Sequence, residues 1–139
     1  MRISIVTLGV TDLLRSSEFY QTWFKTEPAS ASNDNIKFFN LNGTKLALFP
    51  QDELAKDAHI SNEGQGFRGM TLAINADSKV EVDEIFAQGI KSGAKQIKKP
   101  ESVFWGGYSG YLSDPDGHLW EIAWNPFFTK DKQGELMIP

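Results

Sequence analysis

The fold is decided by one stretch near the C-terminal end, which runs from Trp105 to Pro126 and reads WGGYSGYLSDPDGHLWEIAWNP. At its centre, the tetrapeptide from Asp114 to Gly117 has proline where a turn begins and glycine where the backbone needs positive φ. This pattern predicts a tight turn, and the apolar residues on both sides predict two strands. The stretch therefore predicts a β-hairpin.

The returning arm of this hairpin alternates between two kinds of side chain. One face carries bulky apolar residues, namely Trp120, Ile122 and Trp124. On the other face, Glu121 lies between Leu119 and Ala123. Because these apolar neighbours flank the carboxylate, we expect Glu121 to be sheltered from water. An ordinary surface position for Glu121 is the alternative.

Length and composition indicate one folded domain. The chain has 139 residues, of which 40% are hydrophobic and 23% are charged. The net charge is −4 and there is no basic stripe, so we expect no nucleic-acid partner. The absence of cysteine excludes disulfides, thiol nucleophiles and zinc-thiolate sites. With no signal-peptide pattern and no apolar run of about 20 residues, we expect a cytoplasmic protein without a membrane partner.

Two halves of the chain predict the same order of elements: strand, helix, short strand, hairpin. In the first half these are expected at 3–10, 13–24 after a cap at Asp12, within 26–35, and at 36–49 around a turn at Asn42-Gly43. In the second half they are expected at 67–76, 79–92 after a capping box of Ser78 and Glu81, 96–99 and 103–124. The chain therefore contains an internal repeat.

The repeat sets the domain plan and relates residues in the two halves. We expect one domain with a first module over about 1–50, a polar linker at 51–66, a second module over about 67–126 and a tail at 127–139. Within the linker, residues 52–57 predict a helical turn. The equivalent positions Thr7, Ala47, Thr71 and Glu121 are expected to converge on one concave surface.

These motifs resemble the vicinal oxygen chelate superfamily, which includes glyoxalase I, bleomycin-resistance proteins, extradiol dioxygenases and fosfomycin-resistance enzymes. The resemblance covers nearly the whole chain and is carried by LGVTDLLRSSEFYQTWF, GFRGMTLAI and WGGYSGYLSDPDGHLWEIAWNPF. It implies an α+β fold of paired βαβββ modules. These modules form a curved, partly open mixed sheet around a cleft, with the helices on the convex side.

The resemblance also implies where a metal ion would bind. Metal-dependent members use His or Gln, Glu, His and Glu from the first, fourth, fifth and last strands, and these positions here are Thr7, Ala47, Thr71 and Glu121. Only the last is a strong ligand, because alanine has no donor atom and threonine hydroxyls are weak neutral ligands. We therefore expect a degenerate site and no metal cofactor.

Two functions follow from the resemblance and the aromatic residues near the expected cleft. The first is a small-molecule-binding protein of the glyoxalase/bleomycin resistance type, a homodimer that holds a flat or aromatic ligand. The second is a lyase, isomerase or dioxygenase-like enzyme that uses Glu121 as a base or metal ligand. A scaffold domain, its cleft filled by its own side chains, is a third alternative.

The expected ligand-binding residues are Thr7, Ala47, Phe49, Thr71, Trp105, Tyr108 and Glu121, with Phe104 and Tyr111 as further aromatic neighbours.

Overall fold

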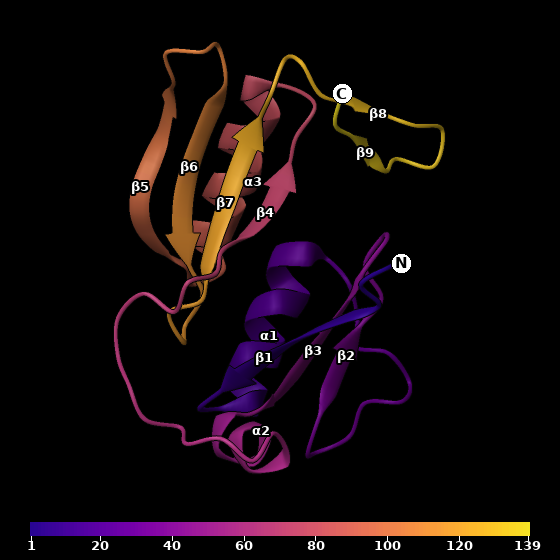
Figure 1. Cartoon of the computed structure of the whole chain (residues 1–139), viewed down its shortest axis with the longest axis vertical. Coiled ribbons are helices and arrows are strands. Elements are labelled where there is room, and N and C mark those ends of the chain that lie inside the picture. The colour runs from indigo at the N-terminus through magenta and orange to yellow at the C-terminus, as the bar shows by residue number, and fades with distance from the viewer. The chain divides into compact units, whose positions relative to one another are not determined.

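The computed structural model describes residues 1–139 and divides them into two compact units, Met1–Gly69 and Met70–Pro139. The first unit combines two helices, and the second unit one helix, with a mixed sheet, so the predicted α+β class is confirmed (Figure 1). No helix of either unit has both the length and the apolar character needed to cross a membrane.

The first unit contains a three-stranded sheet and two helices. Its elements are β1 (Ile5–Val10), α1 (Leu13–Phe24), β2 (Lys37–Phe39), β3 (Lys45–Pro50) and α2 (Gln51–Asp57). The strand order is β1-β3-β2, with β1 parallel and β2 antiparallel to β3. The helical turn expected after the first module is confirmed as α2, which packs against β1 and β3.

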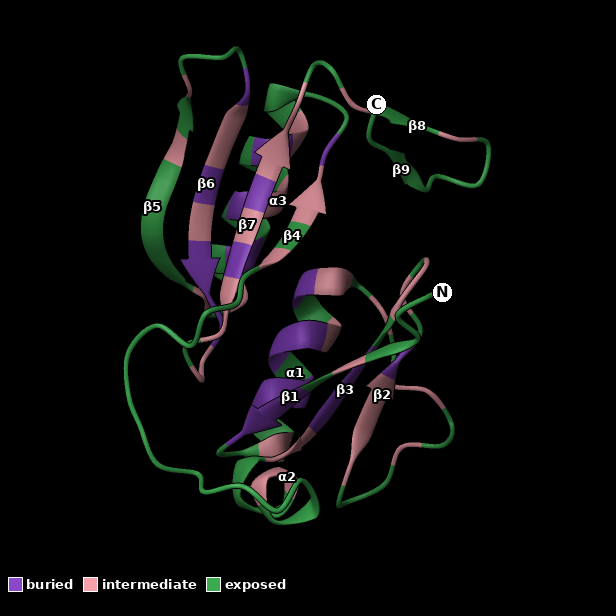
Figure 2. Cartoon of the chain, viewed as in Figure 1, coloured by how far each residue is buried: buried purple, intermediate pink, exposed green.

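Helix α1 forms because its start is capped and one of its faces is apolar. The Asp12 carboxylate accepts a hydrogen bond from the Arg15 backbone N–H at 3.0 Å, as the sequence predicted. Phe19, Tyr20 and Trp23 are buried, and Tyr20 meets Phe39 of β2 with ring centroids 6.5 Å apart. Figure 2 shows this buried side of α1 in purple. The aromatic residues of α1 therefore build the core of the first unit.

Two expectations for the first unit are wrong in detail. No strand forms within 26–35, where Ala29 makes only one backbone hydrogen bond to Phe38, at 2.7 Å. The hydroxyl of Ser32 accepts from the Phe38 N–H at 2.9 Å, so a side chain takes a place that a strand would fill. The connection around Asn42-Gly43 spans residues 40–44 instead of forming a two-residue turn.

The second unit contains the complete βαβββ order. Its elements are β4 (Leu72–Asn75), α3 (Lys79–Lys91), β5 (Lys95–Ser102), β6 (Tyr108–Ser113) and β7 (Leu119–Trp124), followed by the small hairpin of β8 (Thr129–Lys130) and β9 (Leu136–Met137). The main sheet has the order β4-β7-β6-β5, and only β4 and β7 are parallel. Helix α3 packs against β6 and β7 and covers one face of this sheet (Figure 1).

The predicted turn between β6 and β7 is confirmed and is held by a buried carboxylate. Asp114 is 3% exposed, and its Oδ1 accepts hydrogen bonds from the N–H groups of Asp116 and His118 at 2.9 and 2.8 Å. Gly117 has φ of 90°, the positive value that the sequence indicated. This turn fixes the register in which Glu121 meets the neighbouring strand.

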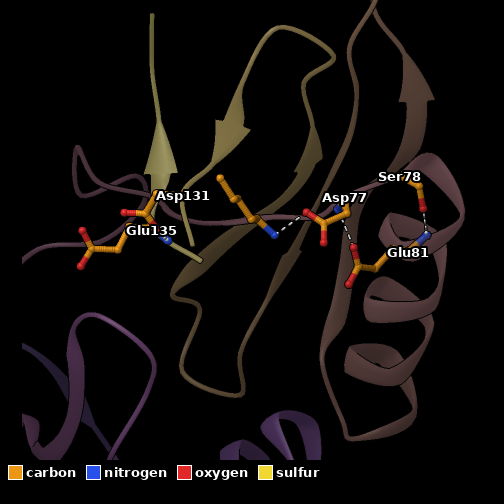
Figure 3. A network of polar contacts seen from close by, with 6 residues as sticks. Asp77, Ser78, Glu81, Asp131 and Glu135 are labelled. Carbon is orange, nitrogen blue, oxygen red and sulfur yellow. Dashed lines mark hydrogen bonds and ion pairs between the residues drawn. The ribbon is translucent and has the colours of Figure 1, made fainter. Parts of the chain in front are cut away.

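Helix α3 begins with the predicted capping box, which Figure 3 shows. The Ser78 hydroxyl accepts from the Glu81 N–H at 3.1 Å, while the Glu81 carboxylate accepts from the N–H of Asp77. The Asp77 carboxylate lies 2.6 Å from Lys130 Nζ, so an ion pair ties β8 to the start of α3. The C-terminal hairpin is thereby anchored within the second unit.

Candidate functional site

The main sheet of the second unit has two unlike faces. Trp120 and Ile122 are buried at 5% and 0% exposure on the face that α3 covers. Glu121 points to the other face, where it is half-buried between Leu119 and Ala123. The predicted alternation along β7 is therefore confirmed. We call the side of the β4-β7-β6-β5 sheet opposite α3 the Glu121 face.

A row of three polar side chains crosses the Glu121 face. Glu121 is paired with Tyr111 of β6, and Tyr111 is paired with Lys98 of β5. Burial raises the pKa of Tyr111, and so do the charge of Glu121 and a hydrogen bond to it, whereas the charge of Lys98 lowers that pKa. Glu121 and Lys98 are therefore each close enough to act on Tyr111.

Lys98 reaches this row because β5 is irregular. The pairing of β5 with β6 shifts on both sides of Lys98, between Gln96 and Lys98 and between Lys98 and Glu101. A Cβ on Gly110 would lie 2.7 Å from Pro100 N and 2.8 Å from Lys98 O, so only glycine permits this approach. Lys98 Nζ also lies 3.0 Å from Glu101 Oε1 in a half-exposed ion pair.

The first unit brings together the predicted site residues that belong to it. Thr7 of β1 is paired in parallel with Ala47 of β3, as the repeat required. Thr7 is exposed and Ala47 is 1% exposed. Phe49, two residues after Ala47 and half-buried, shares its side of β3. The three residues thus line one side of the first sheet.

Thr71 is not the structural equivalent of Thr7, which corrects the sequence prediction. The strand expected from residue 67 begins only at Leu72, and Ala73 is the residue paired with Glu121. Gly66 and Gly69 have φ of 81° and 76°, which keeps the preceding segment out of an extended strand. Thr71 is exposed and precedes the sheet.

Tyr108 lies on the opposite side of the second sheet, not on the Glu121 face. It is paired with Trp124 and its hydroxyl donates to Asp83 Oδ1 of α3 at 2.7 Å. This hydrogen bond, burial and the charge of Asp83 raise the pKa of Tyr108. Tyr108 and Tyr111 are three residues apart on β6. Because successive side chains of a strand point to opposite faces of the sheet, the two tyrosines lie on opposite faces. Tyr108, which was predicted as a ligand-binding residue, therefore does not share a face of the sheet with Glu121.

The other two aromatic candidates lie in the β5–β6 connection. Phe104 is fully exposed, and Trp105 is 44% exposed with its ring lying against Gly107. Neither belongs to a strand, so the sheet register does not assign them to the Glu121 face. The residue that sequence reasoning underrated is Lys98, because the bulge that positions it leaves no trace in simple alternation.

The donor atoms at the predicted positions do not fit a divalent metal chelate. Glu121 is a carboxylate, Thr7 and Thr71 offer only neutral hydroxyls, and Ala47 offers none. The strand register makes Ala73, and not Thr71, the residue paired with Glu121, and alanine has no donor atom, so the equivalent positions hold one donor fewer. No group of three or more His, Asp or Glu side chains in the structure could hold a metal ion.

The family of the chain is shown by comparison with known proteins. Residues 2–122 match the Glyoxalase/Bleomycin resistance protein/Dioxygenase superfamily, and the chain belongs to this superfamily. The resemblance noted in the sequence motifs is thereby confirmed.

Similar proteins include several that are named as enzymes. A trivalent organoarsenical cleaving enzyme of Bacillus sp. (strain MD1) is 27% identical over 136 residues, which are 94% of this chain and 74% of that protein. The crystal structure of a glyoxalase-related enzyme from Fulvimarina pelagi has a TM-score of 0.89 at 30% identity, covering 99% of this chain and 98% of the other. A lactoylglutathione lyase from Agrobacterium tumefaciens has a TM-score of 0.67 at 26% identity, covering 88% and 92% of the two chains.

Proposed function

We propose that this protein binds a small organic molecule on the Glu121 face without a resident metal ion. The observation that supports this most directly is the cross-strand row of Glu121, Tyr111 and Lys98. Three polar side chains on adjacent strands give a ligand several directed contacts, while the apolar Leu119 lies beside them on β7. Such a mixture suits a flat ligand with polar substituents.

The donor set supports a metal-free mode of binding. A single carboxylate with neutral hydroxyls makes a weak site for a hard or borderline divalent ion. Glu121 has Tyr111 as its cross-strand neighbour. In this proposal its carboxylate therefore meets the ligand directly, and the family's chelate position serves as a ligand contact.

A homodimer in the cytoplasm completes the proposal. Both features follow from the family resemblance and the composition, and both stay predictions. Light scattering at micromolar concentration tests the dimer, and a monomer there would contradict an arrangement in which two copies share a ligand site.

The test of binding is an amide chemical-shift titration with a library of aromatic and antibiotic-like small molecules. We expect at least one compound to shift amides of β6 and β7 around Tyr111 and Glu121, in buffer that contains a chelator. Glu121→Gln should change these shifts, whereas the matched variant Glu84→Gln on α3 should not, because Glu84 is exposed on the helix. Shifts confined to other parts of the chain would overturn the proposal.

An enzymatic role is the alternative, and one contact favours it. The cross-strand pair of Glu121 and Tyr111 places a carboxyl group beside a phenol, as general acid–base catalysis requires. Two of the similar proteins are named as an organoarsenical cleaving enzyme and a lactoylglutathione lyase. A reaction on a trivalent arsenical would proceed here without a protein thiolate, because the chain has no cysteine.

Glu121→Gln separates the two functions. Turnover of lactoylglutathione or of a trivalent organoarsenical that disappears in this variant would establish a base-dependent enzyme. Simple binding of an aromatic ligand should largely survive the same change, because glutamine keeps the shape and a hydrogen-bond acceptor.

A further inference from the structure

We propose that the Glu121 face selects ligands that carry two opposite charges, with an acidic group on Lys98 and a basic group on Glu121. This inference rests on the proposed function and names the ligand class for the same face. The observation that supports this inference is the order of the three side chains across the sheet, in which the neutral phenol of Tyr111 separates the ammonium group of Lys98 from the carboxylate of Glu121.

The spacing of the row sets the size of the ligand. Neighbouring strands in a sheet lie about 4.8 Å apart, so Lys98 and Glu121, two strands apart, have backbones separated by roughly 10 Å. Tyr111 lies between them and is in register with both. A ligand with its charged ends on either side of one ring or a short chain spans this distance.

Both charged side chains keep hydrogen-bonding capacity for a ligand. A carboxylate has about four acceptor positions and an ammonium group has three donors. Glu121 lies beside Tyr111 in the sheet, and Lys98 Nζ is paired with Glu101 Oε1 at 3.0 Å. Each charge is thus held in place by one partner and still has free positions for a second.

The alternating charges on this face disfavour ligands whose charges all have the same sign. An anion that approaches Lys98 also meets the carboxylates of Glu121 and Glu101. A cation that approaches Glu121 also meets Lys98 across Tyr111. A ligand with an acidic group at Lys98 and a basic group at Glu121 is attracted at both ends, because each of its charges then faces a side chain of the opposite charge.

Tyr111 supplies the neutral surface between the two ends. It is half-buried, and its phenol, with a pKa above the ordinary value of 10.0, is uncharged at neutral pH. An uncharged ring offers flat apolar contact to the middle of the ligand. We therefore expect an aromatic or similarly flat spacer between the charged groups.

The test compares four probes of similar shape by chemical-shift titration: 4-(aminomethyl)benzoate, benzoate, benzylamine and benzyl alcohol. At exposed sites one added ion pair changes affinity by roughly two- to fivefold. We expect 4-(aminomethyl)benzoate to bind more tightly than benzoate and than benzylamine by about this factor in each case. Equal Kd values for the charged probes would overturn the inference.

Single variants assign each end of the probe. Lys98→Met should remove the advantage of 4-(aminomethyl)benzoate over benzylamine, and Glu121→Gln should remove its advantage over benzoate. The neighbouring exposed lysine gives the control Lys99→Met, in which both advantages should persist. An advantage that survives in Lys98→Met would contradict the assigned role of this residue.

The neutral probe separates this inference from the proposed function. If benzyl alcohol shifts the amides around Tyr111 as strongly as 4-(aminomethyl)benzoate does, the charge selection is wrong while small-molecule binding stands. If none of the four probes nor any library compound affects the Glu121 face, both proposals are wrong.

Discussion

Tyr111 lies directly across from Glu121 in the antiparallel pair of β6 and β7, so the two side chains share one face of the sheet. Burial and this acidic neighbour raise the pKa of the phenol above its ordinary value of 10.0. Tyr111 is therefore a neutral hydrogen-bond donor at neutral pH, which is the state that both proposals use.

Titration of Tyr111 should show this coupling. The phenolate absorbance of the native protein should contain a component with a midpoint above pH 10.0 that is missing in Tyr111→Phe. In Glu121→Gln the Tyr111 pKa should fall but stay raised, because burial is the largest cause of the shift. A Tyr111 pKa unchanged by Glu121→Gln would contradict the contact.

The same contact predicts a pH dependence of stability. A phenol whose pKa is raised on folding contributes stability that is fully present below pH 10.0 and is lost as the pH rises through the raised pKa. The difference in urea midpoint between the native protein and Tyr111→Phe should therefore be constant near neutrality and shrink in strongly alkaline buffer. A difference that grows with alkaline pH would contradict this sign.

Gly110→Ala should disturb the bulge that positions Lys98. The added methyl group would lie within 3.0 Å of the backbone of Lys98, Lys99 and Pro100, so β5 must move. Overpacking of this kind costs about 1–3 kcal/mol in the free energy of unfolding. In Gly107→Ala the obstructing atoms belong to the Trp105 side chain, which is free to rotate away, so this control should lose less. Equal losses in urea denaturation would argue against a special role for Gly110.

Ser78→Ala should weaken the start of α3. The variant loses the acceptor for the Glu81 N–H, and the loss of such a cap costs about 1 kcal/mol. Ser30→Ala, at an exposed position outside helices and strands, should change the unfolding free energy little. Denaturant titration of both variants gives the comparison, and a Ser78→Ala protein as stable as the parent would contradict the cap.

Lys130→Met should loosen the C-terminal hairpin without unfolding the second unit. The side chains of Lys130 and Asp77 are 32% and 71% exposed, so their ion pair contributes at most about 1 kcal/mol. Hydrogen exchange should become faster in β8 and β9 and stay unchanged in β6. Lys132→Met, at an exposed position in the turn of the same hairpin, is the control.

Local signals predicted the elements that position the candidate site. The turn residues from Asp114 to Gly117, the caps at Asp12 and Ser78, and the alternation along β7 each act through nearest neighbours, so the sequence alone carries them. Glu121 was placed on the side opposite Trp120 for this reason, and the structure confirms it.

The errors have a common physical origin in pairing between strands. The start of β4 depends on the glycines before it and on β7 beside it, so Thr71 was assigned to a strand that begins one residue later. Tyr108 was predicted to bind the same ligand as Glu121, but its register with Trp124 places it on the opposite face of the sheet. Lys98 entered the row only through a bulge, which no periodic pattern reveals.

The most direct test of metal-free binding is the metal content of protein purified without chelator, followed by calorimetric titration with nickel, zinc, manganese and iron(II). Because the donor set offers one carboxylate and neutral hydroxyls, we expect no stoichiometric metal and no tight binding of any of these ions. Stoichiometric metal that is lost in Glu121→Gln would contradict the account and would favour a metal-dependent enzyme instead.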